Sequence, residues 1–143
     1  MADAVIERLT EVSVKVAEQI GGLLPQLTAS AEILTPERLG RVLAMPGGVY
    51  VARVQGRIVG TVQRVDVSHS VRTICWIEDF VVDEAFRGQG IATRLLETAI
   101  AEAPAEAGSI NLTSNPTRVS SHRVYTRLGF KMRDDTTLWR LGL

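Results

Sequence analysis

Residues 81–92 have the sequence VVDEAFRGQGIA, and they join a predicted strand to a predicted amphipathic helix. The glycines in this stretch, Gly88 and Gly90, allow backbone N–H groups to approach a ligand closely. The first turn of the following helix adds N–H groups without helical acceptors and a partial positive charge. Arg87 adds a permanent cation. The stretch is therefore typical of a site for a phosphate or pyrophosphate group.

Two common phosphate-binding loops fit this stretch poorly. A Walker A loop ends in Gly-Lys-Ser/Thr, and residues 81–92 contain no lysine. A dinucleotide fingerprint needs a third glycine where Thr93 stands, and it opens a strand–helix–strand unit, whereas a run of strands precedes this stretch. A different kind of phosphate site is indicated.

The segment before the glycine-rich stretch is predicted to form a meander of three strands. Residues alternate between apolar and polar over Val49–Val54 and Ile58–Val67, and Arg72–Val82 is predicted as the third strand. Turn sequences at Gln55–Arg57 and Ser68–Ser70 separate them. Consecutive strands joined by such short turns are antiparallel.

The segment after it continues with a helix and a crossover. Apolar residues recur at helical spacing over Gly90–Ala103, and a strand is predicted at Ser109–Thr113. This crossover makes the strands Arg72–Val82 and Ser109–Thr113 parallel. A helix over Thr117–Leu128 and a last strand over Thr137–Leu141 complete the chain.

The N-terminal part is predicted to hold one strand and two helices. The strand is Val5–Thr10, and the first helix is Glu11–Leu27, weakened by Gly21 and Gly22. A second, short helix starts at Thr35, which supplies the N-terminal cap. The alternation of strands and helices along the chain is α+β in character.

Size and charge exclude several classes of protein. The chain has 143 residues, with 45% hydrophobic and 22% charged residues, which predicts one globular domain over residues 1–143. Its formal net charge of +0 argues against nucleic acid or an anionic membrane as a partner. One cysteine and two histidines predict no disulfide and no metal site. We expect a cytoplasmic protein, because no secretory signal or membrane span is recognisable.

Two blocks of sequence resemble the GCN5-related N-acetyltransferase (GNAT) superfamily. Residues 87–92 resemble its signature R/Q-x-x-G-x-G/A, with Ala92 in place of the commoner glycine. Residues 111–116 and then 125–130, which end in Tyr-x-Arg-x-Gly-Phe, resemble its second block. The resemblance implies one GNAT domain of α+β class: a mixed, mostly antiparallel sheet flanked by helices, with the parallel strands Arg72–Val82 and Ser109–Thr113 splayed at the cofactor site.

The resemblance also implies acetyl-CoA as co-substrate and no metal. Backbone amides of the strand before the glycine-rich stretch would hold the pantetheine arm and the thioester carbonyl; these are Phe80, Val81 and Val82. Amides of the stretch itself would hold the pyrophosphate; these are Arg87, Gly88, Gln89, Gly90, Ile91, Ala92 and Thr93. Asn115 and Arg118 would contact pantetheine or phosphate, or would only cap and solvate the following helix.

Catalysis requires an acid and a base. Tyr125 occupies the family position of the acid that protonates the leaving thiolate, although its helical spacing also fits a core residue. Glu78 and Asp79 are adjacent carboxylates in an apolar strand, and strand alternation places them on opposite faces. We favour Glu78 as the base and Asp79 as a structural or substrate-binding residue. The alternative is that an arginine or a helix N-terminus satisfies both.

The predicted function is direct transfer of an acetyl group, in a ternary complex, from acetyl-CoA to a primary amine of a small molecule or peptide. A catalytically inactive CoA-binding regulatory module and an unrelated nucleotide-binding protein are the alternatives. The apolar region around residues 21–31 suggests no strongly acidic funnel for polycations. The acceptor amine and the presence of a homodimer stay open.

Five further residues receive non-catalytic interpretations. His69 is predicted at an exposed hairpin tip, and His122 on a helix surface. Cys75 is expected in the core, because no basic partner is visible that would activate its thiol. Trp76 and Trp139 are expected in the core or in a cleft wall.

Overall fold

The computed structural model describes residues 3–143. Contacts divide the chain into two compact units, with the boundary between Thr113 and Ser114. The single domain over residues 1–143 stays a prediction, because compact units defined by contacts can belong to one domain. Within residues 3–143, every helix is too short or too polar to cross a membrane.

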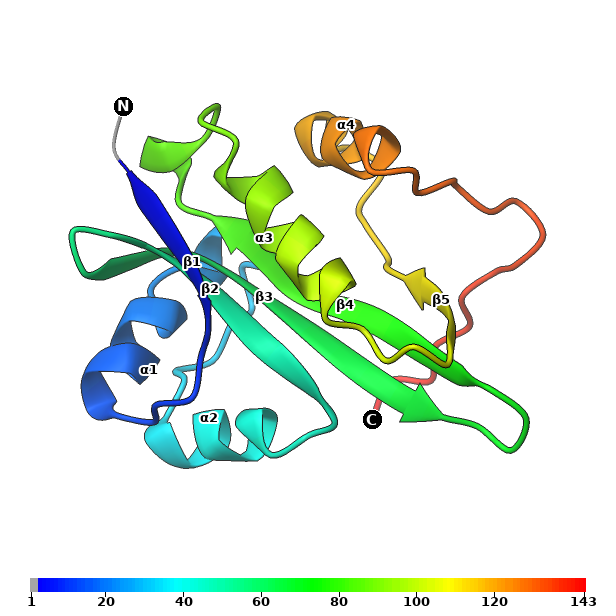
Figure 1. Ribbon diagram of the computed structural model, residues 1–143, viewed down its shortest axis with the longest axis horizontal. Coiled ribbons are helices and arrows are strands. Elements are labelled where there is room, and N and C mark those ends of the chain that lie inside the picture. Colours follow the sequence, from blue (N-terminus) through cyan, green and yellow to red (C-terminus); the bar gives the residue numbers. More distant parts are fainter. Residues whose placement is uncertain (1–2) are drawn as a thin grey trace. The chain divides into compact units, whose positions relative to one another are not determined.

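The first unit is built on a five-stranded sheet whose strands lie in the order β1-β2-β3-β4-β5 (Figure 1). Neighbouring strands are antiparallel except β4 and β5, which are parallel. This confirms the predicted mixed, mostly antiparallel α+β sheet and its one crossover. The strands are β1 (Ala4–Arg8), β2 (Gly47–Val54), β3 (Arg57–Ser68), β4 (Thr73–Val82) and β5 (Ala107–Asn111).

Tight turns close both hairpins where the sequence predicted them. Gln55 and Gly56 both have positive φ, at 50° and 80°, as a two-residue type I′ turn requires. The amide of His69 donates to the carbonyl of Arg72 at 2.7 Å, which closes the second hairpin. His69 is exposed, as predicted.

The helices of the first unit begin at identifiable caps. Ser13 accepts a hydrogen bond from the amide of Val16 at the start of α1 (Val14–Gly21), and Thr35 accepts one from the amide of Arg38 at the start of α2 (Pro36–Leu43). The predicted helix Glu11–Leu27 is shorter than expected, because α1 ends at the two glycines and a short 3₁₀ turn, η1 (Leu24–Gln26), follows.

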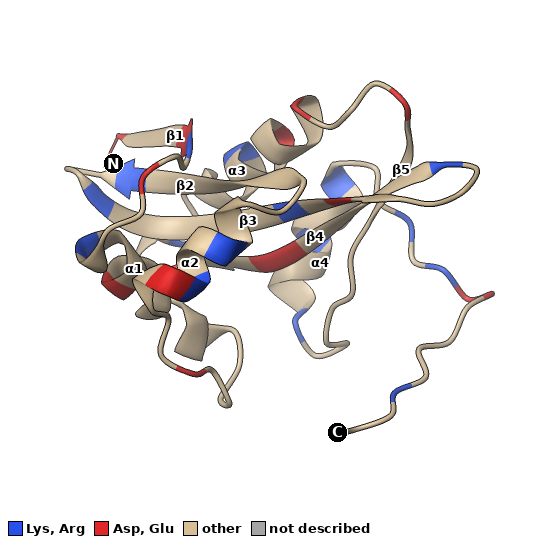
Figure 2. Cartoon of the chain, turned by 90° about the horizontal axis from the view of Figure 1, so that it is seen from below, with Lys and Arg blue, Asp and Glu red and all other residues tan. Residues whose placement is uncertain are grey.

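Helices cover both faces of the sheet (Figure 2). Side chains that alternate along β2 therefore meet a helical layer on each face. Val49 and Val51 belong to the core that contains residues of α1 and α2. On the other face, α3 (Ile91–Ala101) packs against β2 and β3. Gly60 of β3 permits this close approach, since a Cβ there would lie 2.9 Å from the Cδ1 atom of Leu95.

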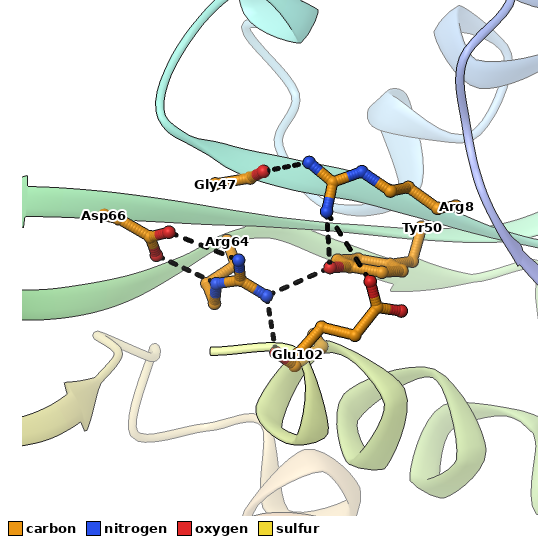
Figure 3. Close-up of polar contacts among 7 residues, drawn as sticks. Arg8, Gly47, Tyr50, Arg64, Asp66 and Glu102 are labelled. Carbon is orange, nitrogen blue, oxygen red and sulfur yellow. Dashed lines mark hydrogen bonds and ion pairs between the residues drawn. The ribbon is translucent and has the colours of Figure 1, made fainter. Parts of the chain in front are cut away.

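A buried polar network joins this face of the sheet to the end of α3 (Figure 3). The Arg64 guanidinium is 3% exposed and donates to the Tyr50 hydroxyl at 3.0 Å and to the Ala99 carbonyl at 2.8 Å. Its other nitrogens donate to both carboxylate oxygens of Asp66, at 2.8 and 3.2 Å. Arg8 donates to the Tyr50 hydroxyl as well. The network therefore satisfies a buried charge and fixes the last turn of α3 on β3.

Cys75 lies fully buried beside this network, which confirms the prediction of a core residue. Burial, followed by the hydrogen bond to Asp66, raises the pKa of the Cys75 thiol to about 11. Burial also disfavours the charged form of Asp66, but hydrogen bonds from Arg64 and Cys75 outweigh it and lower the pKa of Asp66. The thiol is thus held protonated and the carboxyl ionised at neutral pH.

The second unit contains α4 (Val119–Arg127), which ends in a Schellman motif. Gly129 has φ 94°, and its amide donates to the Thr126 carbonyl at 3.1 Å. The amide of Phe130 donates to the Tyr125 carbonyl at 3.0 Å, and the two rings lie 6.1 Å apart. The Gly-Phe pair of the second sequence block therefore has a structural reason, which is to terminate α4.

The prediction of a strand over Thr137–Leu141 is wrong. Residues 131–143 form neither helix nor strand, and Trp139 is 90% exposed rather than part of a core or cleft wall. An alternating segment becomes a strand only when a neighbouring edge satisfies its backbone groups, and periodicity does not report whether such an edge is present.

We expect Asp66→Asn to lower the free energy of unfolding by about 3 kcal/mol, because it leaves the Arg64 charge without its partner. The folded-state pKa of Asp66 is lowered, so its contribution is present above the ordinary value of 3.8 and is lost as the pH falls through the lowered value. Urea unfolding at pH 7 and at decreasing pH measures both effects. Glu7→Gln, which breaks the more exposed Glu7–Arg53 pair, is the control and should cost less than about 1 kcal/mol. Equal costs for the two variants would contradict the account.

Candidate functional site

A β-bulge interrupts β4 at the two acidic residues. Gln63 of β3 pairs with Glu78, and Thr61 pairs with Val81, so that one residue on β3 faces two on β4. Asp79 adopts a left-handed conformation with φ 48°, which aspartate tolerates better than most residues. The strict alternation assumed from the sequence therefore does not hold at this point of the strand.

The bulge lies just past the place where β4 leaves its parallel neighbour. Pairing between β4 and β5 runs from Thr73 to Trp76 and ends at Asn111, while β4 continues to Val82 (Figure 1). Beyond Trp76, the edge of β4 is not paired with β5. This is the stretch that contains the bulge.

The glycine-rich stretch follows β4 directly and begins α3 as predicted. Gly88 has φ 78°, and Gly90, the N-terminal cap of α3, has φ 82°. The amide of Arg94 makes the first helical hydrogen bond, to the Gly90 carbonyl at 3.1 Å. The amides of Ile91, Ala92 and Thr93 therefore lie in the first turn, where helical acceptors are lacking and the partial charge is positive.

Gln89 adds a buried acceptor to this turn. Its side-chain oxygen Oε1 is shielded from solvent and has no hydrogen-bond partner among the described residues. A buried acceptor of this kind is costly unless a donor reaches it. A ligand that supplies an N–H or O–H group would satisfy it, so the turn fits a ligand with such groups as well as a phosphate.

Gln26 connects the turn to a distant part of the chain. Its Oε1 atom accepts from the amide of Glu84 at 2.9 Å and from Arg87 at 3.4 Å, while its Nε2 atom donates to Asp83 at 3.4 Å. The Arg87 side chain also donates to the Val82 carbonyl at 3.0 Å. Arg87 is thus oriented by two separate acceptors.

A cavity of about 500 Å³ borders the bulge. It lies between the sheet, η1, α2 and the segment that joins η1 to α2. Its walls are mostly apolar, and its charged groups are Asp79, Arg38 and Glu32. Glu78 does not line it. The residues around the cavity are Ile20, Leu24, Thr28, Ser30, Ala31, Glu32, Ile33, Leu34, Arg38, Leu39, Val42, Met45, Val49, Thr61, Gln63 and Asp79.

Both carboxyl groups of the bulge have raised pKa values. Burial raises the pKa of Asp79, and the positive charge of Arg38 offsets part of this rise. Burial, and next the charge of Asp79, raises the pKa of Glu78. Such shifts favour proton exchange nearer neutral pH than ordinary carboxyl groups allow.

The structure places the predicted site residues in both units. Glu78 lies within β4, Phe80, Val81 and Val82 end this strand, and the stretch from Arg87 to Thr93 follows within the same unit. The remaining three, Asn115, Arg118 and Tyr125, belong to the second unit.

Within the second unit, each of these residues has a local setting. Asn115 accepts from the amide and hydroxyl of Thr117, at 2.9 and 2.8 Å, and so forms a turn before α4. Arg118 is the N-terminal cap residue of α4, without a side-chain capping bond. Tyr125 is partly buried, with its ring 6.2 Å from that of His122 and also near Phe130.

Sequence reasoning missed Gln26 and Arg38. Neither residue belongs to a motif, and their roles arise from tertiary contacts. The only early signal was that Arg38 lies three residues after the cap Thr35, in the first turn of a predicted helix. Among residues 3–143, no cluster of three or more His, Cys, Asp or Glu suited to a metal ion is present.

The sheet order, the parallel pair β4–β5 and the flanking helices define a GNAT-type fold. The family model described as "Acetyltransferase (GNAT) family" matches residues 24–130. The chain belongs to this family, which confirms the resemblance inferred from residues 87–92 and 125–130. A search of curated proteins found no match.

Solved structures agree with the family assignment at the level of the fold. An acetyltransferase of Trypanosoma brucei is 25% identical, with a TM-score of 0.77, covering 97% of this chain and 100% of that chain. The glucosamine-6-phosphate N-acetyltransferase of Arabidopsis thaliana is 21% identical, with a TM-score of 0.78 and coverage of 98% and 99%. An aminoglycoside N-acetyltransferase in complex with CoA is 17% identical, with a TM-score of 0.79 and coverage of 99% and 96%.

We expect Gln26→Leu to increase amide hydrogen exchange at Glu84 about fivefold, because one net hydrogen bond to that amide is worth roughly 1 kcal/mol. Exchange followed by NMR at single residues measures the effect. Gln19→Leu is the matched control, since Gln19 accepts from the amide of Ile58 at 3.1 Å and should affect exchange there only. Unchanged exchange at Glu84 in Gln26→Leu would show that the link does not form in solution.

Proposed function

We propose that this protein is an N-acetyltransferase that moves the acetyl group of acetyl-CoA to a primary amine of a small molecule, by direct transfer in a ternary complex. One observation carries the proposal: a single strand, β4, bears the bulge that borders the cavity and then leads directly into the phosphate-type turn. Two ligands held at these places would meet at the bulge. The proposal places the enzyme in the cytoplasm, without nucleic acid or membrane as a partner.

The residues for the co-substrate are those that the family resemblance implied. The amides from Arg87 to Thr93 would hold the pyrophosphate, with the partial positive charge of α3 behind them. The end of β4, Phe80 to Val82, would hold the pantetheine arm. Among the similar structures, one is a complex with CoA, which supports CoA as the co-substrate of this fold. Asn115 and Arg118 stay predicted contacts.

The chemistry asks little of the protein beyond positioning and charge. Acetyl-CoA, when bound, supplies an activated acyl group as a thioester. A backbone N–H at the bulge would stabilise the negative charge that develops on the carbonyl oxygen. The cavity would hold the amine in line with the acyl carbon. Tyr125 would donate the proton to the leaving thiolate, a role that rests on the family resemblance.

A carboxylate of the bulge would remove the proton from the amine. Glu78 was the candidate favoured from the sequence, but Asp79 lines the cavity and Glu78 does not. We therefore assign the base to Asp79, with Glu78 as the alternative. The raised pKa of Asp79 suits this role, because a stronger base accepts a proton from an ammonium group more readily.

Gly90→Asp is expected to weaken CoA binding at least about tenfold, because it places a carboxylate where the pyrophosphate would lie; tenfold corresponds to about 1.4 kcal/mol. Gly90→Asn is the matched control, since asparagine has nearly the same shape and tolerates positive φ but carries no charge. Isothermal titration with CoA measures both affinities. Equal affinities for the two variants would place the pyrophosphate elsewhere.

Asp79→Asn is expected to lower kcat about 100-fold, the lower end of what a positioned base contributes. The base must be ionised, so kcat/KM of the unmodified enzyme should fall as the pH is lowered through the pKa of Asp79. This pKa is raised, so the fall should begin at a pH higher than the ordinary value of 3.8 would give. This acidic limb should disappear in Asp79→Asn.

Thiol release from acetyl-CoA across pH measures both parameters. Glu78→Gln is the control and should keep the limb with a change in kcat of less than about threefold. The opposite result, with the limb lost in Glu78→Gln and kept in Asp79→Asn, would reassign the base to Glu78.

A further inference from the structure

The cavity beside the bulge contains opposite charges that do not neutralise each other directly. Asp79 and Arg38 both line it, and the charge of Arg38 acts on Asp79. Yet no ion pair between them is formed within 4 Å in the described part of the chain. Figure 2 shows acidic colour on β4 and basic colour on α2, the elements that carry these two residues. A ligand with both charges would fit between the two side chains.

Apolar residues make up most of the remaining lining, together with the polar residues Thr28, Ser30, Thr61 and Gln63. Leu24, Leu34 and Val42 line the cavity from η1, the segment before α2, and α2. A volume of about 500 Å³ lies in the range of small-molecule pockets rather than that of grooves for folded proteins. The position of Arg38 opposes a ligand that carries several ammonium groups.

We propose, on the basis of the function proposed above, that the acceptor is a free α-amino acid with an apolar side chain. Its ammonium group pairs with Asp79, its carboxylate pairs with Arg38, and its side chain packs against Leu24, Leu34 and Val42. Planar guanidinium groups bind carboxylates through two parallel hydrogen bonds, which suits Arg38 for this task. Glu32 lies at the exposed side of the same cavity and repels a second carboxylate.

The reaction balances with these groups alone. The ammonium group of the amino acid gives one proton to Asp79, and its nitrogen forms a bond to the acetyl carbonyl carbon. The carbon–sulfur bond breaks, and its electron pair leaves with the sulfur. The thiolate takes up one proton from Tyr125, and the nitrogen loses its second proton to solvent. Asp79 and Tyr125 then exchange protons with solvent, so that one proton is released overall. The products are an N-acetyl amino acid and free CoA thiol.

The test compares L-leucine with its decarboxylated analogue, 3-methylbutan-1-amine, in an assay of thiol release from acetyl-CoA. The unmodified enzyme should prefer leucine at least about tenfold in kcat/KM, since the analogue lacks the carboxylate that makes charged hydrogen bonds with Arg38. Arg38→Gln should abolish this preference, by raising the KM for leucine with kcat nearly unchanged. Its kcat/KM for the decarboxylated analogue should change much less than its kcat/KM for leucine, because that amine has no carboxylate for Arg38 to bind; the remaining change reflects the loss of the Arg38 charge beside Asp79.

Arg41→Gln is the matched control, because Arg41 is on the same helix, is exposed and does not line the cavity. This variant should keep the preference for leucine. Equal use of leucine and its analogue by the unmodified enzyme, or faster acetylation of spermidine or kanamycin than of leucine, would overturn the proposal.

A binding measurement separates this proposal from the proposed function. If no amine accelerates thiol release, the acetyltransferase function fails. Calorimetric titration of L-leucine into protein saturated with CoA then still examines the cavity. Binding that is lost in Arg38→Gln and kept in Arg41→Gln would support the ligand class, and absence of binding to the unmodified protein would overturn it.

Discussion

The bulge at Asp79 is the constraint on which the rest of the site depends. An aspartate held in a left-handed conformation costs of order 1 kcal/mol, and the pairs Gln63–Glu78 and Thr61–Val81 on either side hold it there. The extra residue places Glu78 and Val81 on the same face of the sheet. It also brings the carboxyl of Asp79 to the cavity wall, in an otherwise apolar strand.

Two further features keep the surroundings of the bulge in place. Gln26 links η1, which borders the cavity, to the residues that precede the phosphate-type turn. On the other face of the sheet, Arg64 ties the last turn of α3 to β3 through the Ala99 carbonyl. The start of α3, where the pyrophosphate would bind, is thus positioned by contacts at both ends of the helix. Both contacts are made by polar side chains, Gln26 and Arg64, that form several hydrogen bonds each. Such bonds favour a single packing of the helix on the sheet over alternative packings.

The sequence was most informative where local chemistry decides local structure. The hairpin at Gln55 and Gly56, the cap at Thr35 and the turn after β4 were all predicted, because glycine, threonine and proline act on the backbone next to them. The parallel pairing of β4 and β5 followed from the crossover. The resemblance at residues 87–92 then placed the chain in the right family.

Prediction was weaker where distant segments meet. Regular alternation placed Glu78 and Asp79 on opposite faces, but a bulge depends on the neighbouring strand and leaves little trace in a single sequence. Gln26 and Arg38 acquire their roles only when residues about 40 to 60 positions away fold against them. A strand was predicted over Thr137–Leu141, yet no neighbour pairs with this segment within the described chain. Tertiary partners, rather than propensity, decided each of these cases.

An NMR titration of backbone amides with CoA tests the central claim most directly. The account predicts saturable shifts that are largest at Gly88, Gly90 and Ile91 and along the end of β4, because these amides would contact the pyrophosphate and the pantetheine arm. The chemical shifts of amides in the β2–β3 hairpin around Gly56 should not change. Saturable shifts confined to other parts of the chain, or none at CoA concentrations that saturate other members of the family, would contradict it.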